Sequence, residues 1–255
     1  MKTQHLTFLA KHLDQLLNTG SYQDTSLNGI QVESRNSEVA KVAFAVDSGE
    51  LVIEQAIKQK ADLLIVHHGL LWGALERITG AFSRKLDLLL SHECSLYASH
   101  LPLDGHISLG NGAELARILE LDQILPAFRY MGSDIGISAI CPTPCTIDDL
   151  VLRSRNLHGA ITPTIIRAGK ADISRIGIVT GSGSFALHEA HRLGLDLLIS
   201  GEPKQEAFHS AHELKINALF LGHYATETLG VLALKRHIER EFALETVFID
   251  IPTGI

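Results

Sequence analysis

The chain has few cysteines, and this scarcity limits where and how it folds. Only three occur among 255 residues, at Cys94, Cys141 and Cys145. An odd, widely spaced set does not build a disulfide framework, and the single Cys-Pro-Thr-Pro-Cys segment lacks the second pair that would complete a zinc site. We therefore expect reduced thiols inside a packed cytoplasmic protein.

Long apolar runs, aromatic residues and clustered cations are also scarce. No run reaches the ~18 apolar residues of a membrane span, and residues 1–18 have the spacing of an amphipathic helix rather than of a signal peptide. Aromatic residues make up 5% of the chain, and the net charge is −7 without a dense Lys/Arg stripe. Stacking on nucleic-acid bases needs aromatic side chains, and neutralising phosphates needs clustered Lys and Arg. The chain has few of the first and no cluster of the second. The composition thus argues against membrane and nucleic-acid partners.

What the chain does contain is an internal repeat. An apolar strand at 42–46, a helix at 50–60 and a second strand at 62–66 have counterparts 134 residues later. Strand and helix segments in alternation, with continuously apolar strands, are typical of α/β folds with largely parallel sheets. We predict an α/β fold of two related, intimately packed halves with mostly parallel or mixed sheets, at residues 1–125 and 126–255.

Each half also carries a histidine four residues before a carboxylate. His100 and Asp104 follow one apolar strand, and His223 and Glu227 follow its counterpart 123 residues later. Ligands of α/β sheets gather beyond the carboxyl ends of the strands. A single motif of this kind is explained by a helix-capping carboxylate beside an unrelated histidine, but its recurrence at an equivalent point favours a shared site.

A third cluster, His67-His68, ends another apolar strand. Adjacent side chains on a strand point to opposite faces, so both can serve one site only where the strand ends and turns, which Gly69 permits. The alternative is a polar pair that merely caps the strand. Taken with the two motifs, the pattern predicts two divalent ions held by His67, His68, Asp104, His223 and Glu227, with Asp104 and Glu227 as bridges.

Mixed imidazole and carboxylate ligands suit Zn, Mn, Fe, Co or Ni. We place His100 just behind the ligands, where it orients Asp104 or a bound water, and leave direct ligation open. Glu202, at the position equivalent to His68, is either a general base or a cap for the following helix. The Gly181-Ser182-Gly183 turn either cradles a phosphate or is only a tight turn.

The sequence resembles the Nif-three-like family of dinuclear metal proteins, known as GTP cyclohydrolase type 2 homologues. The resemblance covers nearly the whole chain and rests on five segments: Asn28-Gly-Ile-Gln-Val32, Val66-His-His-Gly69, His100-Leu-Pro-Leu-Asp104, Ser200-Gly-Glu202 and Gly222-His-Tyr-Ala-Thr-Glu227. It implies the same five metal ligands and a toroidal homohexamer. The chain departs from the family pattern at 132–136 and 203–205, which leaves substrate contacts there open.

Two functions follow as hypotheses. The first is a metal-dependent hydrolase acting on a nucleotide-like or other small phosphate-bearing substrate, because a paired-metal site with open positions can activate water. The second is a non-enzymatic metal-binding, metal-delivery or scaffold protein that uses the same ligands. The spacing of the ligands does not distinguish the two.

Overall fold

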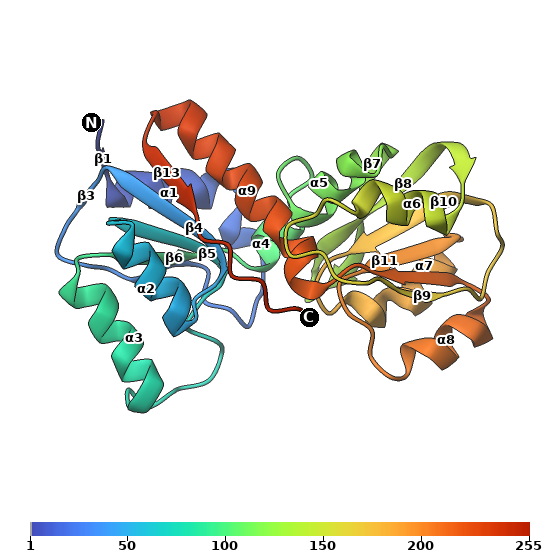
Figure 1. Cartoon of the computed structure of the whole chain (residues 1–255), viewed down its shortest axis with the longest axis horizontal. Coiled ribbons are helices and arrows are strands. Elements are labelled where there is room, and N and C mark those ends of the chain that lie inside the picture. The colour runs from blue at the N-terminus through green and yellow to red at the C-terminus, as the bar shows by residue number, and fades with distance from the viewer. Residues whose placement is uncertain (1) are drawn as a thin grey trace. The chain divides into compact units, whose positions relative to one another are not determined.

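The computed structural model describes residues 2–255, which form two compact units (Figure 1). Unit 1 comprises Met1–Leu103 and Val231–Ile251, and unit 2 comprises Asp104–Gly230 and Pro252–Ile255. The domain boundary expected near residue 125 stays a prediction.

Unit 1 is built on a five-stranded sheet with the order β13-β4-β5-β6-β2. Its first four strands run parallel and β2 is antiparallel. The strands are β2 (Gly29–Val32), β4 (Lys41–Asp47), β5 (Leu63–His68), β6 (Ser95–Ala98) and β13 (Glu245–Phe248). A two-stranded ribbon joins β1 (Gln4–His5) to β3 (Glu38–Val39).

Helices cover the sheet of unit 1. Apolar side chains of α2 (Glu50–Lys58) and α3 (Gly80–Ser91) share one core cluster with alternate residues of β4, β5 and β6. On α1 (Leu6–Leu16), Asp14 accepts a hydrogen bond of 2.8 Å from the buried hydroxyl of Tyr97 on β6. The short elements η1 (Thr19–Ser21) and α4 (Leu101–Asp104) lie in connections.

Unit 2 has a six-stranded mixed sheet with the order β7-β8-β10-β11-β12-β9. Strands β10, β11 and β12 are mutually parallel, whereas the other neighbours pair antiparallel. The strands are β7 (Asp122–Tyr130), β8 (Ser133–Cys145), β9 (Thr164–Ile166), β10 (Ile173–Val179), β11 (Leu197–Ser200) and β12 (Asn217–Phe220). The helical elements are α5 (Asn111–Ile118), α6 (Ile147–Ser154), η2 (Gly183–Ala186), α7 (Leu187–Arg192), α8 (Ala207–Leu214) and the first turns of α9 (His223–Phe242), whose residues from Val231 onward belong to unit 1.

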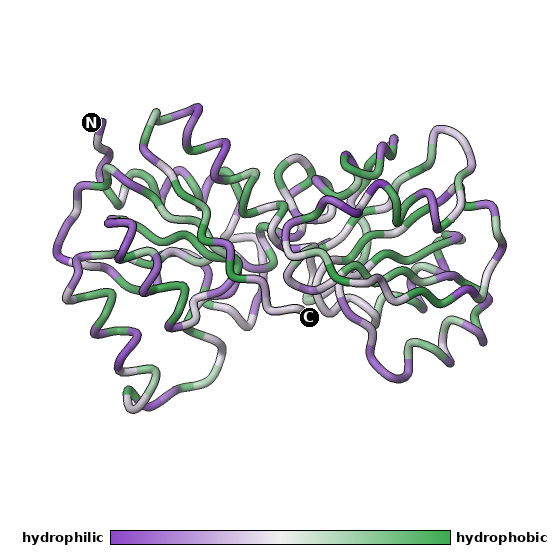
Figure 2. The backbone as a smooth tube through the Cα atoms, in the orientation of Figure 1, coloured by the Kyte–Doolittle hydropathy of each residue, from purple (hydrophilic) through white to green (hydrophobic). Residues whose placement is uncertain are grey.

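The strand register reproduces the sequence repeat. Val42 pairs with Leu63 in unit 1, and Ile176 pairs with Leu197 in unit 2, so both partners are displaced by 134 residues. Figure 2 shows the apolar residues concentrated along the strands of each unit, as expected of strands covered on both faces. The predicted α/β fold with mixed sheets is therefore confirmed.

A half-buried aspartate recurs at the same point of both copies. Asp62 Oδ2 accepts hydrogen bonds from the backbone N–H groups of Ala40 and Lys41. Asp196 Oδ2 accepts equivalent bonds, each 2.9 Å, from Ser174 and Arg175. Each aspartate thus ties the start of one parallel strand to the segment that opens its neighbour.

The cysteines are free and buried, as predicted, although the Sγ atoms of Cys141 and Cys145 lie 3.0 Å apart.

Helix α6 begins with a capping box in which Thr146 and Asp149 exchange hydrogen bonds. No helix among residues 2–255 combines the length and apolarity needed to cross a bilayer.

Candidate metal centre

Three histidines of unit 1 gather beyond the carboxyl ends of two parallel strands. His67 and His68 end β5, and His100 follows β6. Their ring centroids are 4.6 to 5.8 Å apart, and one ring nitrogen of each lies within 4.8 Å of the others. Gly69 directly follows the pair, and both neighbouring imidazoles belong to this group. Unit 1 therefore presents three imidazoles in a group that could hold a metal ion.

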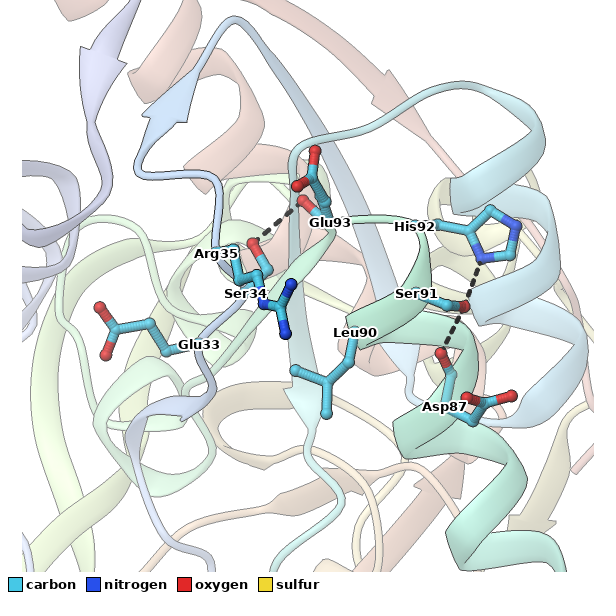
Figure 3. Close-up of a pocket in the computed structure, with 8 residues that line it drawn as sticks. All are labelled: Glu33, Ser34, Arg35, Asp87, Leu90, Ser91, His92 and Glu93. Carbon is cyan, nitrogen blue, oxygen red and sulfur yellow. Dashed lines mark hydrogen bonds between the residues drawn. The ribbon is translucent and has the colours of Figure 1, made fainter.

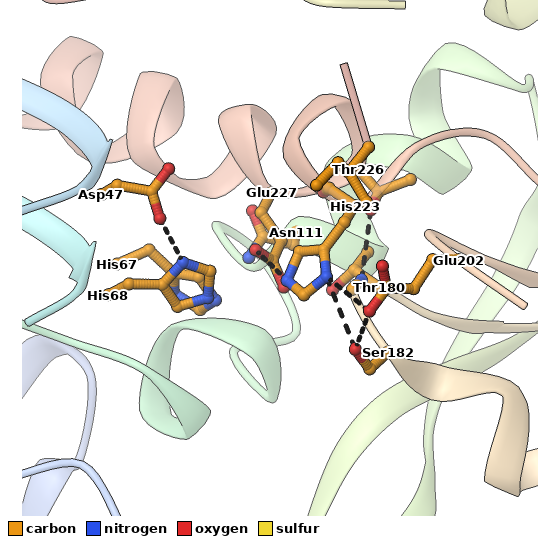
Figure 4. Close-up of polar contacts among 12 residues, drawn as sticks. Asp47, His67, His68, Asn111, Thr180, Ser182, Glu202, His223, Thr226 and Glu227 are labelled. Atoms are coloured by element: carbon orange, nitrogen blue, oxygen red, sulfur yellow. Dashed lines mark hydrogen bonds and ion pairs between the residues drawn. The ribbon is translucent and has the colours of Figure 1, made fainter. Parts of the chain in front are cut away.

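Each of these rings is fixed by an oxygen acceptor at Nδ1. His67 Nδ1 lies 2.9 Å from the carbonyl oxygen of Ser99, and His68 Nδ1 lies 2.8 Å from Asp47 Oδ1 (Figure 4). His100 Nδ1 lies 3.0 Å from Asp24 Oδ1. An acceptor at Nδ1 favours a proton on that nitrogen, and the neutral ring then offers the lone pair of Nε2. This is the arrangement in which histidines serve as metal ligands.

Asp24 is an anchor that the sequence analysis did not identify. Its carboxylate also accepts hydrogen bonds from Asn28 Nδ2 and from the backbone N–H groups of Ser26 and Leu101. Burial raises the pKa of Asp24, but the hydrogen bond and charge of His100, with the hydrogen bonds from Asn28 and Ser26, lower it to about 2. Asp24 is therefore ionised at neutral pH and holds the His100 ring.

In unit 2, His223 and Glu227 occupy successive turns of one helix. The helix that carries them, α9, begins at His223 itself. His223 Nε2 consequently lies one turn from Glu227 and 3.1 Å from its Oε2. This start follows from Gly222, whose φ of +103° lets the chain turn from β12 directly into the helix.

Glu202 anchors the other nitrogen of His223. Its Oε1 lies 3.1 Å from His223 Nδ1 and accepts a hydrogen bond from the Ser182 hydroxyl (Figure 4). Burial lowers the pKa of His223, but Glu227 and Glu202 together raise it to about 9. Burial raises the pKa of Glu202, whereas Ser182 and His223 lower it below its ordinary value. The helix-cap alternative for Glu202 is wrong, because the N-cap of α8 is Glu206.

Asp104 is held by two side chains of unit 2. Its Oδ1 accepts hydrogen bonds from Asn111 Nδ2 at 2.8 Å and from Thr180 Oγ1 at 3.1 Å. Asn111 is itself fixed, because its Oδ1 accepts the backbone N–H of Gly230. Asp104 is only 8% exposed. Its carboxylate is thus held in one orientation before any ligand arrives.

The glycine turn serves close packing. A Cβ at Gly181 would lie 2.2 Å from Glu227 Oε1, and a Cβ at Gly201 would lie 2.6 Å from the Gly181 carbonyl. The N–H of Gly181 donates to Thr226 Oγ1, and the N–H of Gly183 donates to Ser200 Oγ. Since both amides are used inside the unit, the tight-turn alternative fits and the phosphate-cradle alternative is not supported.

A hollow elsewhere in unit 1 has a different character. It has a volume of about 640 Å³ and is shown in Figure 3. Its lining includes Glu33, Asp87 and Glu93, with Arg35 and His92 beside them. None of the predicted ligands lies there, so it is not part of the candidate centre.

Comparisons with known proteins agree on one family. The model of the family Duf34/NIF3 (NGG1p interacting factor 3) matches residues 4–254. A "GTP cyclohydrolase 1 type 2 homolog" of Deinococcus radiodurans is 38% identical, over 97% of this chain and 93% of its own. A protein of the same name from Pyrococcus abyssi is 39% identical, over 97% of this chain and 98% of its own. The crystal structure of TTHA1606 from Thermus thermophilus is 39% identical, with a TM-score of 0.90 over 99% of this chain and 100% of that one.

Proposed function

Because the chain belongs to the Duf34/NIF3 family, we propose that it is a metal-dependent hydrolase whose two divalent ions are bound by His67, His68, Asp104, His223 and Glu227. The observation that carries the proposal is that the ring of each proposed histidine ligand is held in place by a hydrogen-bond partner. Each proposed histidine ligand has Nδ1 on an oxygen acceptor: Ser99 O, Asp47 or Glu202. The donor set of imidazoles and carboxylates suits the ions named above.

Ligands and their anchors have separate tasks in this proposal. Bound ions would lower the pKa of a bound water and polarise the scissile group of the substrate. Asp47 would keep His68 in the tautomer that offers Nε2. Glu202 would orient His223, which must give up its Nε2 proton when an ion binds. Asn111 and Thr180 would hold Asp104, the proposed bridge together with Glu227. His100 stays outside the ligand set, fixed by Asp24.

Glu202 is better suited to orienting His223 than to acting as a general base. A base must be able to accept the proton of the attacking water, and its pKa should lie near the working pH. The Glu202 carboxylate already accepts from Ser182 and pairs with His223, and its pKa is lowered. The proposed substrate is nucleotide-like or another small phosphate-bearing molecule, in keeping with the names of the relatives.

The experiment combines metal content with turnover. Protein purified without chelator is analysed for metals and incubated with GTP and a panel of phosphoesters, beside His68→Ala and the control His92→Ala. We expect wild type and the control to bind metal and turn over, and His68→Ala to lose both. Equal turnover by wild type and His68→Ala would sink the assignment of the site.

Two further outcomes separate the alternatives. Bound metal that exchanges fast to an acceptor, with no turnover on any substrate, would favour metal delivery over hydrolysis. The homohexamer implied by the resemblance is also a proposal, and sedimentation of the purified protein tests it.

A further inference from the structure

An apolar cleft in unit 1 lies between β2, α3 and the segment that follows the double histidine. Its volume is about 480 Å³, within the range of small-molecule pockets. Its walls include Leu27, Trp72, Ile78 and Phe82. Leu27 and Ile78 are more than half exposed, and Trp72 is 39% exposed, so the cleft leaves large apolar side chains open to solvent. The segment 70–84 contains the residues that the first copy of the repeat has in excess over the second.

The wall of this cleft is held by hydrogen bonds. Gln31 Oε1 accepts the backbone N–H groups of Leu70 and Leu71 at 2.6 and 3.1 Å, and its Nε2 donates to the carbonyl of Leu27. Trp72 Nε1 donates to the carbonyl of Gly69 at 2.9 Å. A Cβ at Gly69 would lie 2.3 Å from Gln31, so glycine is needed for this approach. The indole is therefore set in place without a ligand.

Trp72 also adjoins the histidines of the candidate centre. Its ring lies edge-on to His100 with the centroids 5.0 Å apart, and 6.1 Å from His68. One indole thus forms a wall of the cleft and lies beside His100 and the proposed ligand His68. A molecule bound beside Trp72 would reach both.

We propose that this cleft binds a planar aromatic ring carried by the phosphate-bearing substrate of the metal centre. The inference rests on the proposed function and adds the class of substrate to it. Indole and aliphatic walls favour an apolar planar group. Charge sets the direction of the bound molecule, because Glu76 also lines the cleft and repels a phosphate, whereas the histidine end would hold cations.

Trp72 supplies the measurement, because it is the single tryptophan of the chain. Its fluorescence is followed during titration of the metal-loaded protein with phenyl phosphate and, separately, with methyl phosphate. We expect phenyl phosphate to bind about tenfold more tightly, as burial of one ring predicts. Equal affinities for the two esters would overturn the proposal, as would the absence of any change in emission.

Two matched variants, one inside the cleft and one outside it, test whether phenyl phosphate binds in the cleft. Ile78→Asn changes an exposed wall residue, and Leu51→Asn changes a residue of α2 that is 66% exposed and lies outside the cleft. Ile78→Asn should weaken phenyl phosphate several-fold and leave methyl phosphate unchanged, whereas Leu51→Asn should leave both unchanged. Equal effects of the two variants, or self-association of the protein that buries Trp72 without ligand, would count against the proposal.

Benzyl alcohol, which has the ring but no phosphate, separates this proposal from the proposed function. The ring alone should still change Trp72 emission in metal-stripped protein and in His68→Ala. If benzyl alcohol binds but metal loading does not tighten phenyl phosphate, the metal centre as proposed fails while the cleft stands. If metal loading tightens both esters equally and benzyl alcohol has no effect, the cleft proposal fails while the metal centre stands.

Discussion

At the scale of single residues, the centre depends on residues that are not proposed ligands of the ions. Ser99, Asp47, Asp24 and Glu202 each place an oxygen on the Nδ1 of one histidine. Such partners lower the cost of ligation because the ring is already oriented and in the correct tautomer. The role of these anchors in metal binding can therefore be tested by substitution, as can that of the ligands.

Removing an anchor should weaken metal binding without unfolding the protein. We expect Asp47→Ala to lower metal affinity by about 10- to 100-fold, because His68 loses its Nδ1 partner. Asp47→Asn keeps an oxygen acceptor and should lose less. Competition with a chelator measures the affinity, and Asp87→Ala on the surface is the control. An Asp47→Ala protein with wild-type affinity would show that the anchor is dispensable.

The glycine beside Glu227 gives a second prediction. Gly181 has a φ of +58°, and its Cβ would collide with Glu227 Oε1. Gly181→Ala should therefore lower the free energy of unfolding by at least about 1 kcal/mol and reduce metal content. Gly20→Ala is the control, since no atom lies within 4 Å of its Cβ. Denaturant unfolding and elemental analysis give the two values, and matching results for the two variants would contradict the expectation.

The residue scale also shows where sequence reasoning stops. The sequence indicated His67, His68 and His100 because they follow apolar strands, and the structure groups them accordingly. Nothing near Asp24 indicated a partner 76 residues away, because a side-chain contact of this kind depends on the tertiary fold. Glu202 was noticed through the repeat, but its function became apparent only from its contacts with Ser182 and His223.

At the scale of elements, the repeat was the most reliable guide. The offset of 134 predicted the strands of both copies, and the register of β4 with β5 and of β10 with β11 follows it. The start of α9 at His223 is not evident from apolar periodicity, because the apolar pattern of a helix becomes clear only after its polar first turns. Helix ends are set by local geometry such as that at Gly222, which hydrophobic periodicity does not report.

The aspartate that joins β10 to β11 gives a prediction with a pH dependence. Burial raises the pKa of Asp196, but Lys170 and the N–H groups of Ser174 and Arg175 lower it below its ordinary value. The unfolded chain therefore binds the proton more readily than the folded one. The stabilisation is present above the ordinary pKa of 3.8 and is lost as the pH falls through the lower folded value.

Asp196→Asn should thus be less stable than wild type at neutral pH, by about 1 kcal/mol, and the difference should shrink in acid. Denaturant unfolding at a series of pH values measures it. The exposed Asp172→Asn should follow the wild-type curve. A stability difference between wild type and Asp196→Asn that does not change with pH would exclude this origin.

At the scale of the whole molecule, the proposed ligands come from both units. Bound metal should then stabilise the folded chain, by about 2.7 kcal/mol for each site at a hundredfold excess over its Kd. Thermal unfolding of stripped and metal-loaded protein tests this. His68→Ala changes unit 1 and Glu227→Ala changes unit 2, and both should lose most of the stabilisation. A full metal response in either variant would remove that residue from the ligand set.

The division of the chain between the units has a consequence for its biosynthesis. Unit 1 opens the chain but recruits Val231–Ile251, and β13 pairs with β4 only through Glu245–Phe248. On the ribosome, β4 must therefore remain an open sheet edge until Glu245–Phe248 has been translated. We expect nascent chains cut short before β13 to need protection from chaperones, although all of His67, His68 and Asp104 have by then emerged.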